Sequence, residues 1–324
     1  MKVTVLYSEV AEHSSLDDLD VLMQVEAVSQ ALQKLGHKPI PLPISLDLSA
    51  ALERLNEQRP DFVFNLVEGL QGVGRFIHFA PALLDQLKVP YSGGSTHALY
   101  VTTNKILSKN LLRAADLPTP VWSSSTDALQ TKPPFPPPYI VKPAWEDASV
   151  GIDEESLVYE REQLAEILGK KTTRHGECLV EAYIDGREFN LGILAGLDGP
   201  MALPAAEMLF SDFPPDKPRI VDYRAKWHED SFEYQNTTRT FDWPASDAAL
   251  IQRMQDIALR CWQLFGLRGY ARVDFRVDGH GHPWILEVNV NPCISPDGGF
   301  VAASQRVGLK YEEMIDRIIH DSMR

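Results

Sequence analysis

Residues 269–292 read GYARVDFRVDGHGHPWILEVNVNP, and this stretch carries the clearest structural signal in the chain. Two runs rich in β-branched and aromatic residues flank a glycine-containing loop, which is the pattern of a β-hairpin. Strand side chains alternate between the two faces of a sheet, so Asp274 shares a face with Arg272. In the same way, Glu287 shares a face with Asn289. The pattern therefore predicts carboxylate and amide oxygens gathered on one face of a sheet.

Three of these side chains are oxygen donors that suit a hard cation. Asp274, Glu287 and Asn289 are ligands that Mg²⁺ takes in proteins, and Mn²⁺ is an acceptable substitute. By the same alternation, Leu286 faces the opposite side. A solvated sheet face is the alternative, with Arg272 as a cross-strand ion-pair partner that contributes little. The triplet therefore indicates a metal site only if phosphate-binding groups accompany it.

The composition is that of an ordinary globular protein. With 324 residues, 44% hydrophobic and 23% charged, the chain has room for two or three modest domains. No apolar run approaches the roughly 20 residues that span a bilayer, and the start lacks a secretory signal, so we expect a cytoplasmic protein. Three separated cysteines argue against a disulfide framework. A net charge of −14 argues against nucleic-acid and membrane partners.

The predicted elements begin with strands and helices in alternation, which favours a small parallel sheet. Helices are expected over 19–37, 75–88, 102–120, 246–267 (with Ser246 as N-cap) and 310–323. Strands are expected at 2–7, 37–44, 59–69 and 139–143, and on both sides of the turn Asp185–Gly186. Residues 205–243 show little periodicity, and a long irregular stretch of this kind is usually functional or mobile.

Candidate phosphate-binding groups accompany the oxygen triplet. Lys142 ends an apolar strand just before a loop, where a lysine can reach a phosphate, and Lys105 and Lys226 are further candidates. The loop that follows can present the Ser149 hydroxyl and the amides around Gly151 to phosphate oxygens. Surface lysines that merely extend into solvent are the alternative. No GxGxxG follows the first strand, which disfavours a dinucleotide-binding domain.

A second group suggests a place for a nucleotide base and sugar. The segment Glu181, Ala182, Tyr183 and Ile184 ends an apolar strand and has the character of an adenine slot. Glu188, after the Asp-Gly turn, can accept hydrogen bonds from ribose hydroxyls. For both carboxylates the alternative is an exposed position on an edge strand.

Taken in order, these pieces resemble the ATP-grasp superfamily, and within it the D-alanine–D-alanine ligase-like proteins. Each motif is weak alone, whereas the ordered set from about residue 90 onward is specific. The stretches that carry the resemblance are VPYSGGSTHALYVTTNKILSKNLLRAADLPTP, PYIVKPAWEDASVGI, CLVEAYIDGREFNLGIL, VDYRAKW and GLRGYARVDFRVDGHGHPWILEVNVNP.

The resemblance implies a three-part α/β ATP-grasp architecture and a homodimer. Residues 1–101 would form an N-terminal parallel α/β domain, 102–184 a central lid, and 185–324 a C-terminal catalytic subdomain with an antiparallel sheet. ATP would lie between the lid and the C-terminal subdomain, held with two Mg²⁺ ions by Asp274, Glu287 and Asn289. The implied nucleotide-binding residues are Lys105, Lys142, Ser149, Glu181, Ala182, Tyr183, Ile184, Glu188, Lys226 and Leu286.

The implied reaction joins a carboxylate to an amine. The carboxylate attacks the γ-phosphate of ATP to give an acyl phosphate, and the amine then displaces phosphate and leaves an amide. Such phosphoryl transfer needs positioning and charge neutralisation more than covalent help. Arg272, Lys226 and Ser149 are the implied catalytic residues. Closure of the segment around Lys226 would keep water from the acyl phosphate.

The chain departs from the family pattern where substrates would bind. The stretch NLVEGLQGVGR lacks a family histidine and leaves Glu68 and Arg75 as polar candidates. Trp227 replaces a tyrosine, and Cys293 replaces a glycine, either as an inert small residue or as a nucleophile. SPDGGF offers Ser295, Asp297 and Gly298 to the acceptor, and the Asp297 carboxylate disfavours a plain D-alanine there.

The departures indicate unchanged ATP chemistry on different substrates. The leading hypothesis is a ligase that joins a small carboxylic acid, an amino acid being one candidate, to an amino acid. A D-alanine–D-alanine ligase of cell-wall synthesis with diverged substrate loops is the nearest alternative. A catalytically inactive nucleotide-binding regulator is an alternative of another class.

Overall fold

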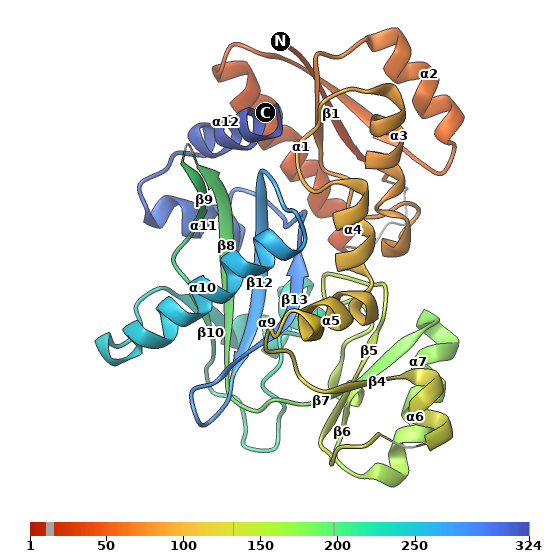
Figure 1. Ribbon diagram of the computed structural model, residues 1–324, viewed down its shortest axis with the longest axis vertical. Coiled ribbons are helices and arrows are strands. Elements are labelled where there is room, and N and C mark those ends of the chain that lie inside the picture. The colour runs from red at the N-terminus through yellow and green to blue at the C-terminus, as the bar shows by residue number, and fades with distance from the viewer. Residues whose placement is uncertain (11–15, 132, 197, 324) are drawn as a thin grey trace.

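Three β-sheets follow one another along the chain, which confirms the three-part α/β architecture (Figure 1). The computed structural model describes residues 1–10, 16–131, 133–196 and 198–323. Within that part of the chain, no helix is long and apolar enough to cross a membrane. The division at 101/102 and 184/185 stays a prediction.

The first sheet is parallel, in the order β2-β1-β3, and forms the N-terminal part of the molecule. Its strands are β1 (Lys2–Ser8), β2 (Lys38–Ile44) and β3 (Phe62–Asn65). Parallel strands covered on both faces read as continuous apolar runs, and the whole of β3 is buried. The helical segments here are α1 (Leu16–Lys34), α2 (Leu48–Gln58), η1 (Gly74–Phe76), α3 (Phe79–Leu87) and α4 (Thr96–Thr103).

The second sheet belongs to the lid and has the order β4-β7-β5-β6. Its strands are β4 (Trp122–Ser124), β5 (Tyr139–Pro143), β6 (Leu157–Val158) and β7 (Cys178–Ala182). Tyr139 and Val141 pack under helices on one face, so Ile140 and Lys142 point to the other face. The helical segments are α5 (Lys105–Ala114), α6 (Ser125–Thr131), η2 (Glu154–Ser156), η3 (Arg161–Gln163) and α7 (Leu164–His175).

The third sheet has the order β11-β10-β8-β12-β13, with β9 also paired to β8. Its strands are β8 (Arg187–Gly196), β9 (Gly199–Ala202), β10 (Ala206–Phe210), β11 (Thr237–Thr240), β12 (Tyr270–Val277) and β13 (Pro283–Asn289). Helix α10 (Ala248–Leu264) packs on one face through Met254 and Ala258 against Val273 and Phe275. The opposite face therefore presents Arg272, Asp274 and their neighbours to the interior of the molecule.

The C-terminal helix returns to the N-terminal part (Figure 1). Ile315 and Ile319 of α12 (Tyr311–Ser322) share a buried cluster with Val3, Val25 and Phe64. The two ends of the chain are thus joined by one apolar core. The remaining helical segments are α8 (Tyr223–Trp227), α9 (Phe232–Asn236), η4 (Ala245–Asp247), α10 (Ala248–Leu264) and α11 (Gly299–Arg306).

Two local predictions are wrong. The helix expected over 102–120 is broken at Asn104, whose side chain accepts from Leu107 N at 2.8 Å and caps α5. Ser246 lies inside a 3₁₀ turn, so that Asp247 stands at the N-cap of α10. The strands expected on both sides of Asp185–Gly186 are present as β7 and β8, but they belong to different sheets, so this turn connects the lid to the catalytic subdomain.

The stretch 205–243 is less irregular than its sequence indicates. It contains β10, α8, α9 and β11, each of only four or five residues. Elements this short give no recognisable periodicity and depend on tertiary contacts, such as the antiparallel pairing of β10 with β8.

Gly186 is a position where only glycine fits, and its replacement should destabilise the fold. Its φ is +151°, and a Cβ there would lie 1.9 Å from the Val277 carbonyl oxygen. We expect Gly186→Ala to lose about 2 kcal/mol or more, which lowers the melting temperature by about 5 °C.

Gly169→Ala is the matched control, because a Cβ added to this α7 glycine would have nothing within 4 Å of it. Removing a helix-interior glycine should stabilise the protein by about 0.5–1 kcal/mol. Thermal melting of both variants by circular dichroism checks the pair. Equal melting temperatures would contradict the argument.

Candidate active site

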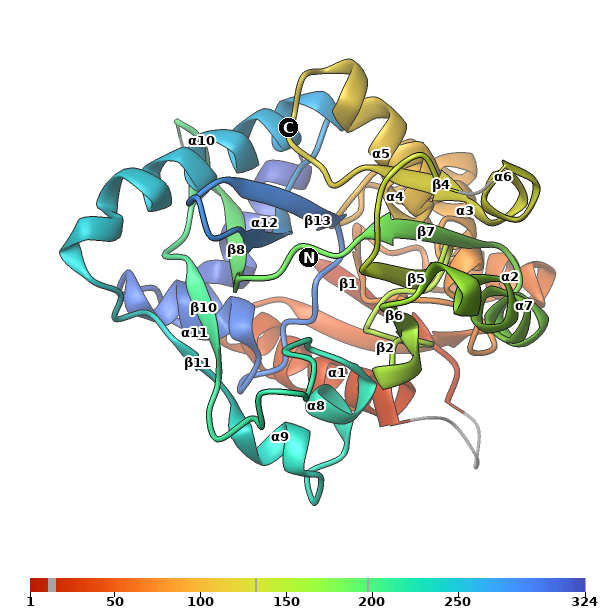
Figure 2. The same ribbon diagram turned by 90° about the horizontal axis from the view of Figure 1, so that it is seen from below.

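A cavity of about 940 Å³ opens between the three parts of the molecule. Figure 2 shows lid strands β5 and β7 on one side of this region and strands β8, β10 and β13 on the other. The predicted site residues that line it are Glu68, Lys105, Lys142, Ser149, Glu188, Lys226, Arg272, Asp274, Leu286, Glu287, Asn289, Ser295, Asp297 and Gly298. Fourteen side chains or backbones predicted from separate motifs therefore meet in one place.

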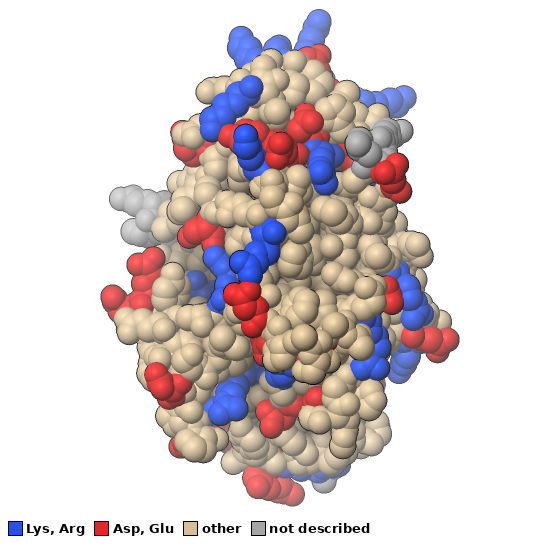
Figure 3. Space-filling view, turned by 90° about the vertical axis from the view of Figure 1, so that its left-hand side faces the viewer, with Lys and Arg blue, Asp and Glu red and all other residues tan. Residues whose placement is uncertain are grey.

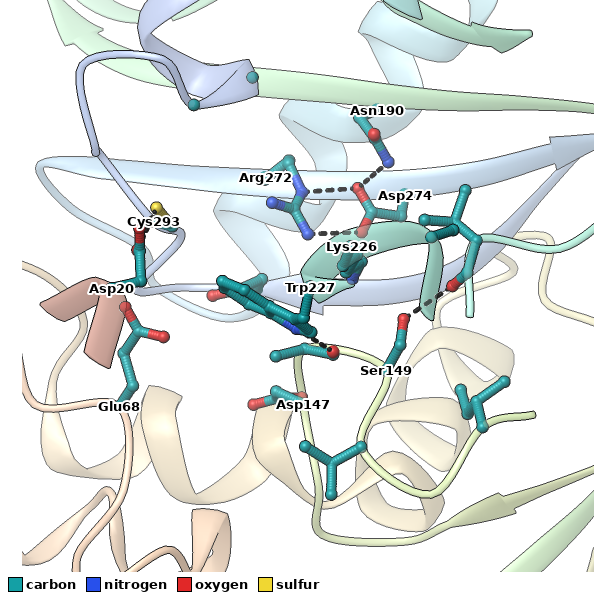
Figure 4. Close-up of a pocket in the computed structure, with 18 of the residues that line it drawn as sticks. Asp20, Glu68, Asp147, Ser149, Asn190, Lys226, Trp227, Arg272, Asp274 and Cys293 are labelled. Carbon is teal, nitrogen blue, oxygen red and sulfur yellow. Dashed lines mark hydrogen bonds and ion pairs between the residues drawn. The ribbon is translucent and has the colours of Figure 1, made fainter. Parts of the chain in front are cut away.

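The oxygen triplet and Arg272 lie together on the cavity face of the β12–β13 hairpin. Asp274 stands directly opposite Glu287, and Arg272 stands opposite Asn289. The Arg272 guanidinium donates to both Asp274 oxygens, at 2.8 and 2.9 Å. The side chain of Asn190 on β8 donates a third hydrogen bond to Asp274, at 2.7 Å (Figure 4). The close grouping that the sequence pattern predicted is thus present.

Simple alternation would turn the Leu286 side chain away from the cavity, but Leu286 lines the cavity. The hairpin register shifts so that Asp274 pairs with Glu287 while Phe275 pairs with Ile285. Leu286 is therefore the extra residue of a β-bulge, which re-aims side chains locally. As a result, both Leu286 and Glu287 line the cavity.

The donor set fits a divalent cation. Burial tends to raise the pKa of Glu287, but Lys105, Lys226 and Arg272 outweigh it and bring that pKa to about 2. The pKa of Asp274 is raised by burial and by Glu287 despite Arg272. The raised pKa of Asp274 shows that this carboxylate would gain from a further positive charge beside it, which Mg²⁺ would supply. Among the described residues no cluster of three or more His, Cys, Asp or Glu is placed to hold a metal, and the candidate here is two carboxylates plus an amide.

Two lysines at the lid side share one buried carboxylate. Glu181 is almost wholly buried and pairs with Lys142 at 2.7 Å and with Lys109, a residue that the sequence motifs did not single out. Lys105 donates to the Glu146 carbonyl and lies 3.5 Å from Asp147. Two ammonium groups on one Glu181 carboxylate leave a surplus of positive charge, which suits a phosphate.

A smaller cavity of about 70 Å³ lies beside the lysines and has the walls of a base-binding slot. Ile140, Ile152 and Ile220 supply its apolar surface, and Glu181, Tyr183 and Ile184 of the predicted segment line it. Ala182 lines neither cavity. The amides of Ala182 and Tyr183 already donate to Val121 and Pro138 carbonyls. Hydrogen bonds to a base must therefore come from other groups of the segment.

The segment around Lys226 is hydrogen-bonded to the lid loop that contains Ala148 and Ser149. The Trp227 indole donates to the Ala148 carbonyl at 3.2 Å, and the Ser149 hydroxyl donates to the Val221 carbonyl at 2.7 Å. Ala148 and Ser149 both have positive φ, an unfavourable backbone for residues other than glycine. This fastening holds Lys226 in the wall of the cavity, and the catalytic role of Ser149 stays a prediction.

Comparison with known protein families identifies the chain. Residues 117–320 match the family model described as the D-ala D-ala ligase C-terminus. The D-alanine–D-alanine ligase of Aquifex aeolicus is 31% identical over 298 residues, covering 91% of this chain and 92% of that protein. The chain belongs to the D-alanine–D-alanine ligase family.

Solved structures of this family have the same fold. A D-alanine–D-alanine ligase from Bacillus anthracis complexed with ATP superposes with a TM-score of 0.76 at 22% identity, covering 100% of this chain and 98% of that one. The VanG D-Ala:D-Ser ligase of Enterococcus faecalis superposes with a TM-score of 0.74 at 17% identity, covering 99% of both chains.

At one end of the cavity this family member has an acidic group that sequence motifs missed. Asp20 on α1 accepts from the Cys293 thiol at 3.0 Å and the Ser295 hydroxyl at 2.9 Å. Gln24, one turn later, donates to Asp20 and, at 2.8 Å, to Glu68. Figure 4 shows Asp20, Glu68 and Cys293 together, apart from Lys226 and Arg272. The acidic run LDDLD at the start of a helix was the available signal.

One predicted substrate residue, Arg75, lies outside the cavity, whereas Asp297 lies in its wall as expected. Arg75 does not line the cavity and instead lies over the Trp145 ring, 5.1 Å from its centre. Asp297 lines the cavity, but its backbone carbonyl accepts from Arg239 of β11, which lines the cavity too. The acceptor end therefore carries a cation as well as an acid, so the Asp297 carboxylate alone does not exclude a carboxylate-bearing acceptor.

The Cys293 thiol should be unreactive in the folded protein. Burial raises its pKa well above the ordinary range, and the negative charges of Glu68 and Asp20 raise it further. Because the thiolate is the reactive form, we expect negligible alkylation of Cys293 by iodoacetamide at pH 7.5. Asp20→Asn removes one negative charge and should accelerate the labelling.

Peptide mass spectrometry measures that labelling, and the two other cysteines are internal controls. Burial raises the pKa of Cys178 to about 11 and that of Cys261 to about 12, so both should stay unlabelled until urea unfolds the chain. Labelling of Cys293 in the native wild type as fast as in urea would restore the nucleophile hypothesis.

Proposed function

We propose that this protein is an ATP-dependent, ADP-forming ligase that joins a small carboxylic acid to an amino acid through an acyl phosphate. The observation that carries the proposal is the cavity in which phosphate-binding lysines from the lid meet the carboxylates of the β12–β13 hairpin. An apolar slot of base-binding character adjoins the same lysines. ATP and small carboxylate and amino-acid substrates are thus its proposed partners.

The chain's own residues account for most of the proposed reaction. Lys105, Lys142 and Lys226 bind the nucleotide phosphates and offset their charge as the substrate carboxylate attacks the γ-phosphorus. Mg²⁺, held by Asp274, Glu287 and Asn289, would supply further charge to the phosphate oxygens when bound, and we propose two ions, with Mn²⁺ as a substitute. The amine then attacks the acyl carbon, loses a proton and expels phosphate.

Arg272 is already partly engaged. Its Nε and Nη2 donate to the two Asp274 oxygens here, so a metal ion bound at Asp274 would free these donors for the acyl phosphate. The segment fastened by Trp227 keeps water from the acyl phosphate meanwhile. This exchange links metal binding to the readiness of Arg272.

Two other functions compete with this proposal. A D-alanine–D-alanine ligase with altered substrate contacts is favoured by the relatives, and VanG, named as a D-Ala:D-Ser ligase, illustrates a change of acceptor on this fold. An inactive nucleotide-binding regulator is disfavoured by the complete set of metal ligands, Arg272 and Lys226 lining one cavity.

Phosphate release tests the proposal. Amino acids and small acids are screened in pairs with ATP and Mg²⁺, and one pair should support ADP and phosphate formation. Glu287→Gln should lower that rate about 100-fold or more, because it removes a ligand charge at the reacting phosphate. Glu312→Gln, which breaks only a surface pair with Lys34, should leave it unchanged.

The outcomes of this phosphate-release screen distinguish the three candidate functions. Release that depends on D-alanine alone at ordinary concentrations supports the D-alanine–D-alanine ligase. Nucleotide binding without release for any pair supports the regulator. A fully active Glu287→Gln variant would refute the metal assignment.

We also propose a cytoplasmic homodimer formed through α1. Leu16, Leu19, Leu22 and Met23 expose apolar side chains along this helix, and such a contiguous apolar face indicates a protein contact. All three cysteines are free, as suits a reducing compartment. Acidic and basic side chains are interspersed on the face drawn in Figure 3, without a large single-sign area there, which fits a protein without nucleic-acid or membrane partners.

Light scattering after size exclusion should give twice the 36.3 kDa chain mass. Replacing Leu19 and Met23 by Glu should shift the protein to monomers, because each charge would have to be buried at the interface. Tyr159→Glu, at an exposed position of the lid, is the matched control and should remain dimeric. A monomeric wild type at micromolar concentration would refute the dimer.

A further inference from the structure

Arg276 is a buried charge for which the proposed reaction has no use. It lies on β12, two residues after Asp274 on the same face, and is only 3% exposed. It is one of the residues that line the proposed base-binding slot. Burying an arginine is unfavourable unless its charge is paired and its donors are bonded, so its partners indicate what it holds in place.

The partners of Arg276 come from two separate segments, residues 186–188 and the stretch that contains Arg219. It pairs with the Glu188 carboxylate at 2.9 Å, and the two residues stand directly opposite each other on β12 and β8. It donates to the carbonyl of Gly186, at the connection between lid and catalytic subdomain, at 3.0 Å. It also donates to the carbonyl of Arg219, in the segment that leads to Lys226.

Glu188 is the partner that faces both cavities. It lines the base-binding slot and also the large cavity that holds the phosphate-binding lysines. The sugar of a nucleotide must lie between its base and its phosphates, which is where this carboxylate stands. Arg276 engages Oε2 of Glu188, so Oε1 can accept hydrogen bonds from sugar hydroxyls.

We propose that Arg276 is a positioning residue that fixes the Glu188 carboxylate and thereby sets a preference for ribonucleotides over deoxyribonucleotides. The inference rests on the proposed use of ATP and names a residue that determines the specificity of that site. It makes Arg276 a determinant of sugar recognition that does not touch the sugar.

The charge state of Glu188 gives the electrostatic reason. Burial raises the pKa of Glu188, Arg276 opposes that rise most strongly, and Asp274 adds to it. Without Arg276, the buried carboxylate would gain a proton or turn toward solvent. A neutral carboxyl group is a weaker acceptor for a hydroxyl than a carboxylate, so discrimination between sugars should fall.

Titration calorimetry tests the inference without knowledge of the other substrates. Dissociation constants are measured for ATP, 2′-deoxyATP and 3′-deoxyATP with the wild type, Arg276→Met and Arg276→Lys. The wild type should bind ATP about 10- to 100-fold more tightly than at least one deoxy analogue, as expected for one hydrogen bond to a charged group. In Arg276→Met, the affinity for ATP should fall to the wild-type affinity for that deoxy analogue. The affinity for the analogue itself should not change. Arg276→Lys should be intermediate.

Two further variants separate positioning from general damage. Glu188→Gln should lose the same discrimination, and adding Arg276→Met to it should cause no further loss, because the two residues act through one contact. Arg253→Met removes an exposed arginine of α10 and should retain the wild-type ratio. Circular dichroism confirms folding, and Arg276→Lys carries the test if Arg276→Met does not fold.

The outcomes distinguish this inference from the proposed function. A folded Arg276 variant with the wild-type ratio overturns the role of Arg276. A wild type that binds all three nucleotides equally overturns the role of Glu188 as well. A wild type that binds no nucleotide refutes the proposed ATP-dependent function itself.

Discussion

The opposed carboxylates of Asp274 and Glu287 are the constraint around which the cavity is arranged. Two negative charges on neighbouring strands are unfavourable unless positive charge is brought to them. Arg272 provides part of it through two hydrogen bonds to Asp274, and Lys105 and Lys226 lower the pKa of Glu287. The cations that can bind phosphate thus already lie close to these carboxylates, so nucleotide and metal enter a site in which opposite charges face one another.

The same principle extends to the nucleotide slot. Glu181 is held by Lys142 and Lys109, and Glu188 is held by Arg276, each pair joining different elements. Breaking one partner of a buried pair costs about 3–5 kcal/mol because a charge is left uncompensated. The slot is therefore shaped before a ligand arrives, with Glu181 paired inside the lid and Glu188 paired inside the C-terminal sheet.

Structural features with a local cause could be predicted from the sequence, whereas features that depend on long-range contacts could not. Alternation along β12 and β13 placed Asp274, Glu287 and Asn289 together because it needs only one strand and its neighbour. The bulge at Leu286 depends on long-range pairing, because the backbone amide of the neighbouring Ile285 donates to the carbonyl of Pro118, between α5 and β4. Gly186 gives the same local signal in a hairpin and in a connection between sheets, so only the close approach of Val277 distinguishes them.

The substrate end was least predictable because its residues meet only in three dimensions. Asp20 of α1 and the loop of Cys293 and Ser295 are brought together by the core that α12 shares with the N-terminal sheet. The resulting cavity is polarised, with Asp20 and Glu68 at one end and the lysines proposed to bind phosphate toward the lid. In the proposed reaction, an amino acid that enters with its ammonium group toward the acidic end presents its carboxylate to the γ-phosphate. The polarity of the cavity thus favours the orientation in which acyl transfer can begin.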